Sequence, residues 1–280
     1  MTMSMSYSRM LGRIIIYILL IVGSAVMLVP FLWMVSTSLK AQWQVFTIPV
    51  QWIPDPIMWK NYVDTFSKLP FGPWTLNTLK ITFLAIVGAL LSCTVVAYGF
   101  ARYRAPGRNF LFIVMLSTMM LPGTVTMIPT FYLFKIFGWM NTYYPLIVPH
   151  FFGAAFFIFL LRQFFMTLPP ELEESAKIDG ASTIGILVRI ILPLTVPALI
   201  TVAIFQFNGV WNDFMGPLIY LNKPKLYTLA LGINFFKSQN DTQWNYLMTA
   251  SVVCMLPSLI FFFVGQKYFV ESITLTGLKG

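Results

Sequence analysis

The sequence predicts an all-α polytopic membrane protein with six transmembrane helices. Of its 280 residues, 58% are hydrophobic and 10% are charged, whereas a soluble domain carries about 25% charged residues. Six uncharged runs of roughly 20 residues or more are each long enough for a helix to cross the hydrocarbon core. The runs are continuously apolar rather than alternating, which favours helices over barrel strands. The composition and the two cysteines exclude a disordered chain and a disulfide scaffold.

The uncharged runs place the spans in order within one transmembrane domain of residues 14–270, after an N-terminal segment 1–13 and before a tail 271–280. The first run could be a signal peptide, because Arg9 and Arg13 precede it. Its apolar core exceeds the roughly 7–15 residues of such a peptide, so we expect a retained span. Pro122–Gly123 is expected to break the third span, and a tight turn at Gly138–Asn141 to lead into the fourth. The expected spans are about 14–37, 80–101, 109–136, 142–164, 190–213 and 244–267.

The arginines predict the orientation. All of them fall on one side of the six-span arrangement, and positive charge marks the cytoplasmic side. Both termini are therefore expected in the cytoplasm, with segments 1–13 and 271–280 cytoplasmic. The arginines concerned are Arg9, Arg13, Arg102, Arg104, Arg108, Arg162 and Arg189.

The cytoplasmic loop 166–192 is unusually acidic and predicts two short helices. Pro169–Pro170 supplies a helix start, and acidic residues follow in the first turn, where the helix dipole favours anions. Gly180 is a C-terminal stop, and Ser182 can cap a second helix that runs toward Ile191. A helix lying on lipid usually carries Lys and Arg, so the acidic surface favours a protein partner with a basic cleft. The acidic residues are Glu171, Glu173, Glu174 and Asp179.

This loop carries a specific resemblance. Glu174-Ser175-Ala176, three residues, Gly180, nine residues and Ile190-x-Leu192-Pro193 resembles the EAA signature of ABC-importer permease subunits, with Ser175 in place of the first alanine. Further segments resemble the carbohydrate-uptake branch of this family, in particular the second, six-span subunit of maltose-type type I importers, over essentially the whole chain. These segments are Asp179-Gly180-Ala181, Trp211-Asn212-Asp213-Phe214 with Pro217-Leu218-Ile219, and the tail Gly277-Leu278-Lys279-Gly280.

The resemblance implies a non-catalytic membrane subunit of an importer in the bacterial cytoplasmic (inner) membrane. The sequence has no G-x-x-x-x-G-K-[ST] phosphate loop, so ATP and Mg²⁺ are expected in two partner ATPase subunits and no cofactor in this chain. Further expected partners are a second, different permease, an extracytoplasmic solute-binding protein and membrane lipid, but no nucleic acid. The expected cargo is a sugar or oligosaccharide; the alternative is a sugar-derived solute such as a glycerol phosphate ester.

The resemblance also suggests site residues, with other interpretations left open for several. The 222–245 loop could enter the binding protein or be simply solvated, and the tail could reach the ATPases or fray. Polar residues near span five could line the pathway or form hydrogen bonds between helices, and His150 could simply be packed. The assignments are Glu173, Glu174, Ser175, Ala176, Asp179, Gly180 and Ala181 for ATPase coupling; Gly277, Lys279 and Gly280 for the tail contact; Asn208, Trp211, Asn212, Asp213 and His150 for the pathway; Asn240, Asp241 and Gln243 for the binding-protein loop; and no metal ligands.

Three other classes of membrane protein fit the sequence less well. An ion-coupled secondary transporter usually needs carboxylates deep in the membrane, and the six uncharged runs contain none. An intramembrane enzyme would need a His/Asp, Ser–His or paired-acid arrangement within the spans, which we do not find. A non-transporting assembly subunit would not require the acidic loop.

Overall fold

The computed structural model describes residues 2–237 and 242–277, and within these residues it is helical with no β-strand. Four helical segments are long and apolar enough to cross a membrane: Met10–Ser38, Phe71–Arg102, Tyr144–Thr167 and Trp244–Lys267. Two pairs of helices are bent, and counting each pair as one span brings the total to six. Arg108–Met120 and Gly123–Ile136 meet at 99°, and Thr183–Leu194 and Val196–Trp211 meet at 80°. The predicted all-α, six-span class is therefore confirmed.

The chain divides into two compact units. The first comprises Met1–Leu69 and Ile233–Met255, and the second comprises Pro70–Gly232 and Leu256–Gly280. The α-helices are α1 Thr2–Ser38, α2 Lys60–Lys68, α3 Phe71–Arg102, α4 Arg108–Ser117, α5 Gly123–Ile136, α6 Tyr144–Ile147, α7 Ala155–Thr167, α8 Glu171–Ile178, α9 Thr183–Ile186, α10 Leu192–Leu194, α11 Val196–Trp211, α12 Met215–Tyr220, α13 Leu229–Ile233 and α14 Trp244–Gly277.

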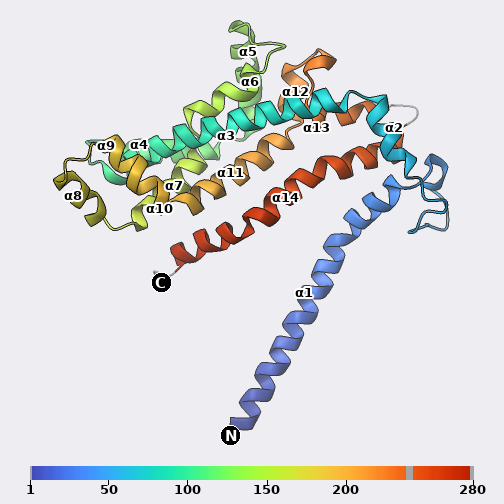
Figure 1. Ribbon diagram of the computed structural model, residues 1–280, viewed down its shortest axis with the longest axis horizontal. Helices are drawn as coiled ribbons and strands as arrows, with labels where there is room; N and C mark the ends of the chain where they lie inside the picture. The colour runs from blue at the N-terminus through green and yellow to red at the C-terminus, as the bar shows by residue number, and fades with distance from the viewer. Residues whose placement is uncertain (1, 238–241, 278–280) are drawn as a thin grey trace. The chain divides into compact units, whose positions relative to one another are not determined.

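Helix α3 is the centre of the second unit because it carries a stripe of small residues. Small side chains four residues apart lie on one face and let neighbouring helices approach closely. Helices α7 and α11 pack against this part of α3, and Figure 1 shows the three helices side by side. The core that results includes Leu161 of α7 and Val202 of α11, both fully buried. The stripe consists of Ala85, Ala89, Cys93 and Ala97.

Several spans are interrupted, and prolines or glycines lie at the interruptions. The helix that begins at Arg108 stops at Met120, and α5 starts at Gly123, so the predicted break at Pro122–Gly123 is confirmed. The predicted tight turn is also present, since Gly138 and Asn141 adopt φ values of 69° and 58°. Between α6 and α7 the chain passes through a short 3₁₀ helix, Val148–Phe152, which contains Pro149.

The predicted start of the second span differs from the observed helix. Helix α3 begins at Phe71 rather than near residue 80, because Lys80 does not end it. The ammonium of Lys80 lies 5.5 Å from the ring centre of Tyr143, within cation–π range. The ring of Tyr143 thus stabilises the charge of Lys80. The sequence prediction had placed the boundary of the uncharged run, and therefore of the span, at this lysine.

Buried polar groups connect the helices of the first unit. The carbonyl of Ser38, at the end of α1, accepts hydrogen bonds from Asn61 of α2 at 2.9 Å and from Thr249 of α14 at 3.0 Å. The amide of Asn245 donates to the side-chain oxygen of Asn61 at 3.3 Å. In the apolar window of α1 no residue is buried within the described structure, so that surface is available to lipid or to another chain.

Replacing Ala89 by leucine should destabilise the protein. Overfilling a tight core typically costs about 1–3 kcal/mol, and Ala89 is 1% exposed on the face of α3 that packs against other helices. Val95→Leu is the matched control, because Val95 is 62% exposed on the same helix. Thermal unfolding of the detergent-purified protein should give a lower midpoint for Ala89→Leu only. Equal midpoints would contradict this packing.

Candidate functional site

The predicted first short helix of the acidic loop is α8, Glu171–Ile178, and it begins directly after Pro170. It ends in a Schellman motif, in which two backbone N–H groups beyond the helix donate back to its last turn. Gly180 donates to the carbonyl of Lys177 at 3.0 Å, and Ala181 donates to the carbonyl of Ala176 at 2.9 Å. Gly180 has φ +82°, a conformation that glycine adopts without a steric penalty. The predicted glycine stop is therefore confirmed.

The second short helix is α9, Thr183–Ile186, and the Ser182 hydroxyl caps it by accepting a hydrogen bond from the Gly185 N–H at 3.2 Å. The helix then continues through a π-helical turn, Leu187–Ile191, into α10. The chain bends again before α11. The loop thus has the two helices that were predicted, and the second extends further than expected.

Helix α8 has two chemically different faces. Glu173 and Ala176 are 4% and 8% exposed and pack inward. The outer face is exposed and combines acidic with apolar side chains, among them Glu174 and the 86%-exposed Ile178. Of the residues predicted for ATPase coupling, those that the structure leaves exposed are Glu174, Ser175, Asp179, Gly180 and Ala181.

Glu173 joins α8 to the end of α3. One carboxylate oxygen of Glu173 lies 2.7 Å from Arg102 Nε, and the other accepts a hydrogen bond from the Tyr98 hydroxyl at 3.1 Å. A second guanidinium nitrogen of Arg102 donates to the Leu168 carbonyl at 3.0 Å. The carboxylate is thus paired and hydrogen-bonded inside the unit, as a buried charge requires. The sequence did not predict that Tyr98 and Arg102 contact the acidic loop. Their four-residue spacing, which puts both on one helix face, was the only feature that could have indicated a shared contact.

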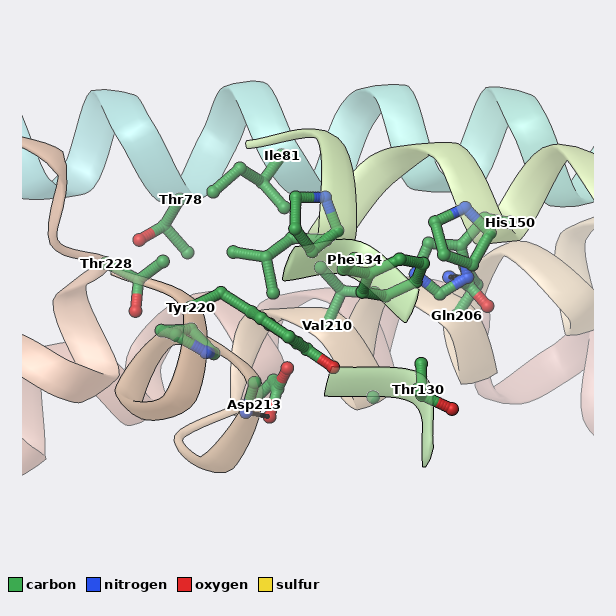
Figure 2. A pocket seen from close by; sticks show the side chains of 16 residues that line it. Thr78, Ile81, Thr130, Phe134, His150, Gln206, Val210, Asp213, Tyr220 and Thr228 are labelled. Atoms are coloured by element: carbon green, nitrogen blue, oxygen red, sulfur yellow. Dashed lines mark hydrogen bonds between the residues drawn. The ribbon is translucent and has the colours of Figure 1, made fainter. Parts of the chain in front are cut away.

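A pocket of about 360 Å³ lies among α3, α5, α6, α11 and α12 (Figure 2). Two residues predicted for the substrate pathway, His150 and Asp213, line it, whereas Asn208, Trp211 and Asn212 do not. No lysine or arginine is among the residues found to line it in the described part of the chain. Its polar lining residues are Thr78, Thr130, His150, Gln206, Asp213, Tyr220 and Thr228.

The polar groups of the pocket are held in defined positions. The Gln206 amide nitrogen lies 3.0 Å from His150 Nδ1. If Gln206 donates, neutral His150 carries its proton on Nε2. Asp213 accepts a hydrogen bond from the Gly216 N–H at 3.0 Å, and a side chain at Gly216 would collide with the Asp213 carboxylate. Burial raises the pKa of Tyr220, and the charge of Asp213 raises it further, so this hydroxyl stays protonated and able to donate.

The other predicted pathway residues make contacts between and within helices. Asn212 donates to the Asn208 carbonyl at 3.0 Å and to the Ser258 hydroxyl on α14 at 3.3 Å. Asn208 donates to the Ile204 carbonyl, one turn earlier in its own helix. Trp211 is 2% exposed and stacks on Phe207, with ring centres 5.3 Å apart. Of these contacts, only the one from Asn212 to Ser258 is a hydrogen bond between two helices.

The remaining predicted residues lie near the limits of the described chain. Asn240, Asp241, Lys279 and Gly280 fall outside the described residues. Gln243 immediately precedes α14, and its backbone N–H donates to the Phe236 carbonyl at 3.1 Å. Gly277 is the last residue of α14. The described residues contain no group of three or more His, Cys, Asp or Glu placed to hold a metal.

Known proteins resemble this chain over nearly its whole length. The arabinooligosaccharides transport system permease protein AraQ of Halalkalibacterium halodurans is 32% identical, with 90% of this chain and 91% of AraQ covered. The sn-glycerol-3-phosphate transport system permease protein UgpE of Pectobacterium atrosepticum is 34% identical, with coverages of 92% and 94%. The fold matches a chain of a bacterial ABC transporter involved in the import of the acidic polysaccharide alginate, with a TM-score of 0.82, 24% identity and coverages of 93% and 97%.

A family model also matches, over residues 93–275, the part of the chain that contains the acidic loop, the pocket residues from α5 to α12 and most of α14. Its description is "Binding-protein-dependent transport system inner membrane component". The match covers more than half of the chain, and the relatives named above are permease subunits of transport systems. The chain therefore belongs to this family, the ABC-importer permeases, as a membrane-embedded subunit.

Proposed function

We propose that this chain forms half of the translocation pathway of an ABC importer for a sugar or oligosaccharide. A second permease supplies the other half, an extracytoplasmic binding protein delivers the solute, and two ATPase subunits bind ATP and Mg²⁺. The observation that carries the proposal is the two-faced helix α8. Its inner face is fixed to α3, and its outer face is exposed and shaped for a partner.

The outer face of α8 has the chemistry of a docking surface. Ile178 and Ile184, at the ends of the connection between α8 and α9, are 86% and 73% exposed. These two apolar side chains lie close to Glu174 and Asp179, which supply charge for a basic cleft, so apolar and acidic groups are both available to a partner here. We assign this surface to the ATPase, with Ser175, Gly180 and Ala181 as further contacts, and Glu173 and Ala176 as the groups that hold the helix from behind.

The fixed inner face explains how ATPase closure reaches the pathway. A force on α8 passes to α3 through the Arg102–Glu173 pair and the Tyr98 hydrogen bond. Helix α3 is tightly packed along its small-residue stripe, and packed elements move as rigid bodies rather than deform. These contacts support a direct connection from the proposed docking surface to the helix at the centre of the second unit.

The orientation, the cargo and the remaining contacts belong to the same proposal. We place both termini, α8 and every arginine on the cytoplasmic side of the bacterial inner membrane. The 222–245 loop faces the binding protein, and the segment 271–280 faces the ATPases. The names of the relatives support saccharide cargo through AraQ. The 34% identity to UgpE makes a glycerol phosphate ester the second candidate.

Two substitutions at Gly180 should show whether coupling to the ATPase depends on the backbone conformation of the loop or on the absence of a side chain. Gly180→Val places a β-branched residue at φ +82°, a strain of about 1–3 kcal/mol, and should reduce the ATPase stimulation by loaded binding protein to the basal rate. Gly180→Asn, which tolerates this conformation, should retain most of the stimulation. The measurement is ATP hydrolysis by the reconstituted transporter. Wild-type stimulation of the valine variant would show that the turn does not couple the subunits.

Removing Arg102 should destabilise the transporter. Arg102→Met leaves the buried carboxylate of Glu173 without its cation, which typically costs about 3–5 kcal/mol. The double variant Arg102→Met/Glu173→Leu replaces the pair by apolar groups and should recover most of the thermal stability. Glu171→Gln is the control, because Glu171 is exposed on the same helix. Unfolding midpoints in detergent provide the comparison, and an unchanged midpoint for Arg102→Met would refute a stabilising role for the pair.

A further inference from the structure

We propose that the pocket shown in Figure 2 is a subsite for an uncharged, polyhydroxylated solute, a neutral saccharide rather than a phosphate ester or an acidic sugar. The inference rests on the proposed importer function and adds the charge class of the solute. It also assigns to this subunit a direct contact with the cargo. Three properties of the pocket carry it: its size, its arrangement of donors and acceptors, and its charge.

The pocket has the size and surface of a small-molecule site. Its volume of about 360 Å³ lies within the roughly 300–1,000 Å³ of such sites, which is enough for a sugar ring. Aromatic and apolar walls alternate with polar groups. Phe134 and Tyr220 form an edge-to-face pair with ring centres 5.5 Å apart, and both line the pocket. Aromatic rings can pack against the C–H faces of a sugar. The hydroxyls of the sugar can then form hydrogen bonds with the polar side chains of the pocket.

The polar groups match hydroxyls, which both donate and accept hydrogen bonds. With Nδ1 facing Gln206, neutral His150 offers an Nε2–H donor. Asp213 is fixed by the Gly216 N–H and, as a carboxylate, retains further acceptor capacity. The hydroxyls of Thr130 and Tyr220 can each donate or accept a hydrogen bond. Figure 2 shows these side chains arranged around one space, with contributions from α5, the 3₁₀ helix after α6, α11, α12 and the segment that joins α11 to α12.

The charge of the pocket is unsuited to anions. Asp213 is the only acidic residue found among the described lining residues, and no arginine or lysine accompanies it there. Sites for phosphate or carboxylate groups normally supply such cations. A solute that carries a negative charge would face repulsion from Asp213 at low dielectric, with no compensating partner. The hydroxyls of a neutral saccharide can instead donate hydrogen bonds to the carboxylate.

Thiol labelling of a reporter in the pocket tests this inference. The full transporter complex carrying Thr130→Cys is reconstituted in proteoliposomes and reacted with a small methanethiosulfonate reagent. The parent complex gives the background rate of labelling, because Cys93 and Cys254 of this chain are buried. The neutral probes are pentose and hexose mono- to trisaccharides. The anionic probes are galacturonate and sn-glycerol 3-phosphate. At least one neutral probe should slow labelling several-fold, and the anionic probes should not.

Asp213→Asn added to the reporter keeps an acceptor for Gly216 but removes the charge. It should weaken the protection about tenfold, the ratio expected for losing one hydrogen bond to a charged group. Thr126→Ala is the control, because Thr126 lies on α5 outside the pocket and its hydroxyl bonds to its own helix; it should leave the protection unchanged. Equal protection by an anionic probe, no protection by any probe, or full protection in Asp213→Asn would each overturn the inference.

The same proteoliposomes distinguish failure of the pocket from failure of the importer function. ATP hydrolysis is measured in parallel with and without loaded binding protein. If the stimulation persists while no neutral probe protects the reporter, the subsite is wrong and the proposed function stands. If no loaded binding protein stimulates hydrolysis by the parent complex, the proposed function itself is wrong.

Discussion

The ion pair between Arg102 and Glu173 is the interaction on which the proposed mechanism depends. It fixes an exposed helix of eight residues to the end of a transmembrane helix, with Tyr98 as a further partner of Glu173 and the Leu168 carbonyl as a further partner of Arg102. Such a short helix would be marginal alone in water. Because its inner face is fixed, its outer face can present charged and apolar groups to a partner without losing its position.

Helix α3 extends this constraint through the second unit. Its last turns hold α8, and its first turns contribute Thr78 and Ile81 to the pocket. Twenty residues separate Thr78 from Tyr98, which corresponds to about 30 Å of helix. The stripe of small residues between them allows close packing on α7 and α11, so the helix has little freedom to bend. One rigid element therefore connects the proposed cargo site with the proposed ATPase contact.

Much of the local structure was predictable, because the responsible residues act on their own backbone. Pro122–Gly123, Gly180 and Ser182 each specify a break, a stop or a cap within a few positions, and each occurs as expected. Tertiary contacts were harder to predict. Nothing local distinguishes the inward Glu173 from the outward Glu174, and the partners Tyr98 and Gln206 lie far away in sequence. Asn208, Asn212 and Asp213 were predicted together as polar groups near the end of span five, and their sequence does not show that Asp213 alone of the three lines the pocket.

The most direct test of this account is whether α8 and α3 move together during the transport cycle. Spin labels at Glu171 on α8 and Val95 on α3, both exposed, report that separation in the assembled transporter with and without ATP. The account predicts one unchanged distance distribution in both states for the wild type, and a broader, ATP-dependent distribution once Arg102 is replaced by methionine. A wild-type distance that shifts with ATP would show that α8 slides on α3 and would contradict rigid coupling through the ion pair.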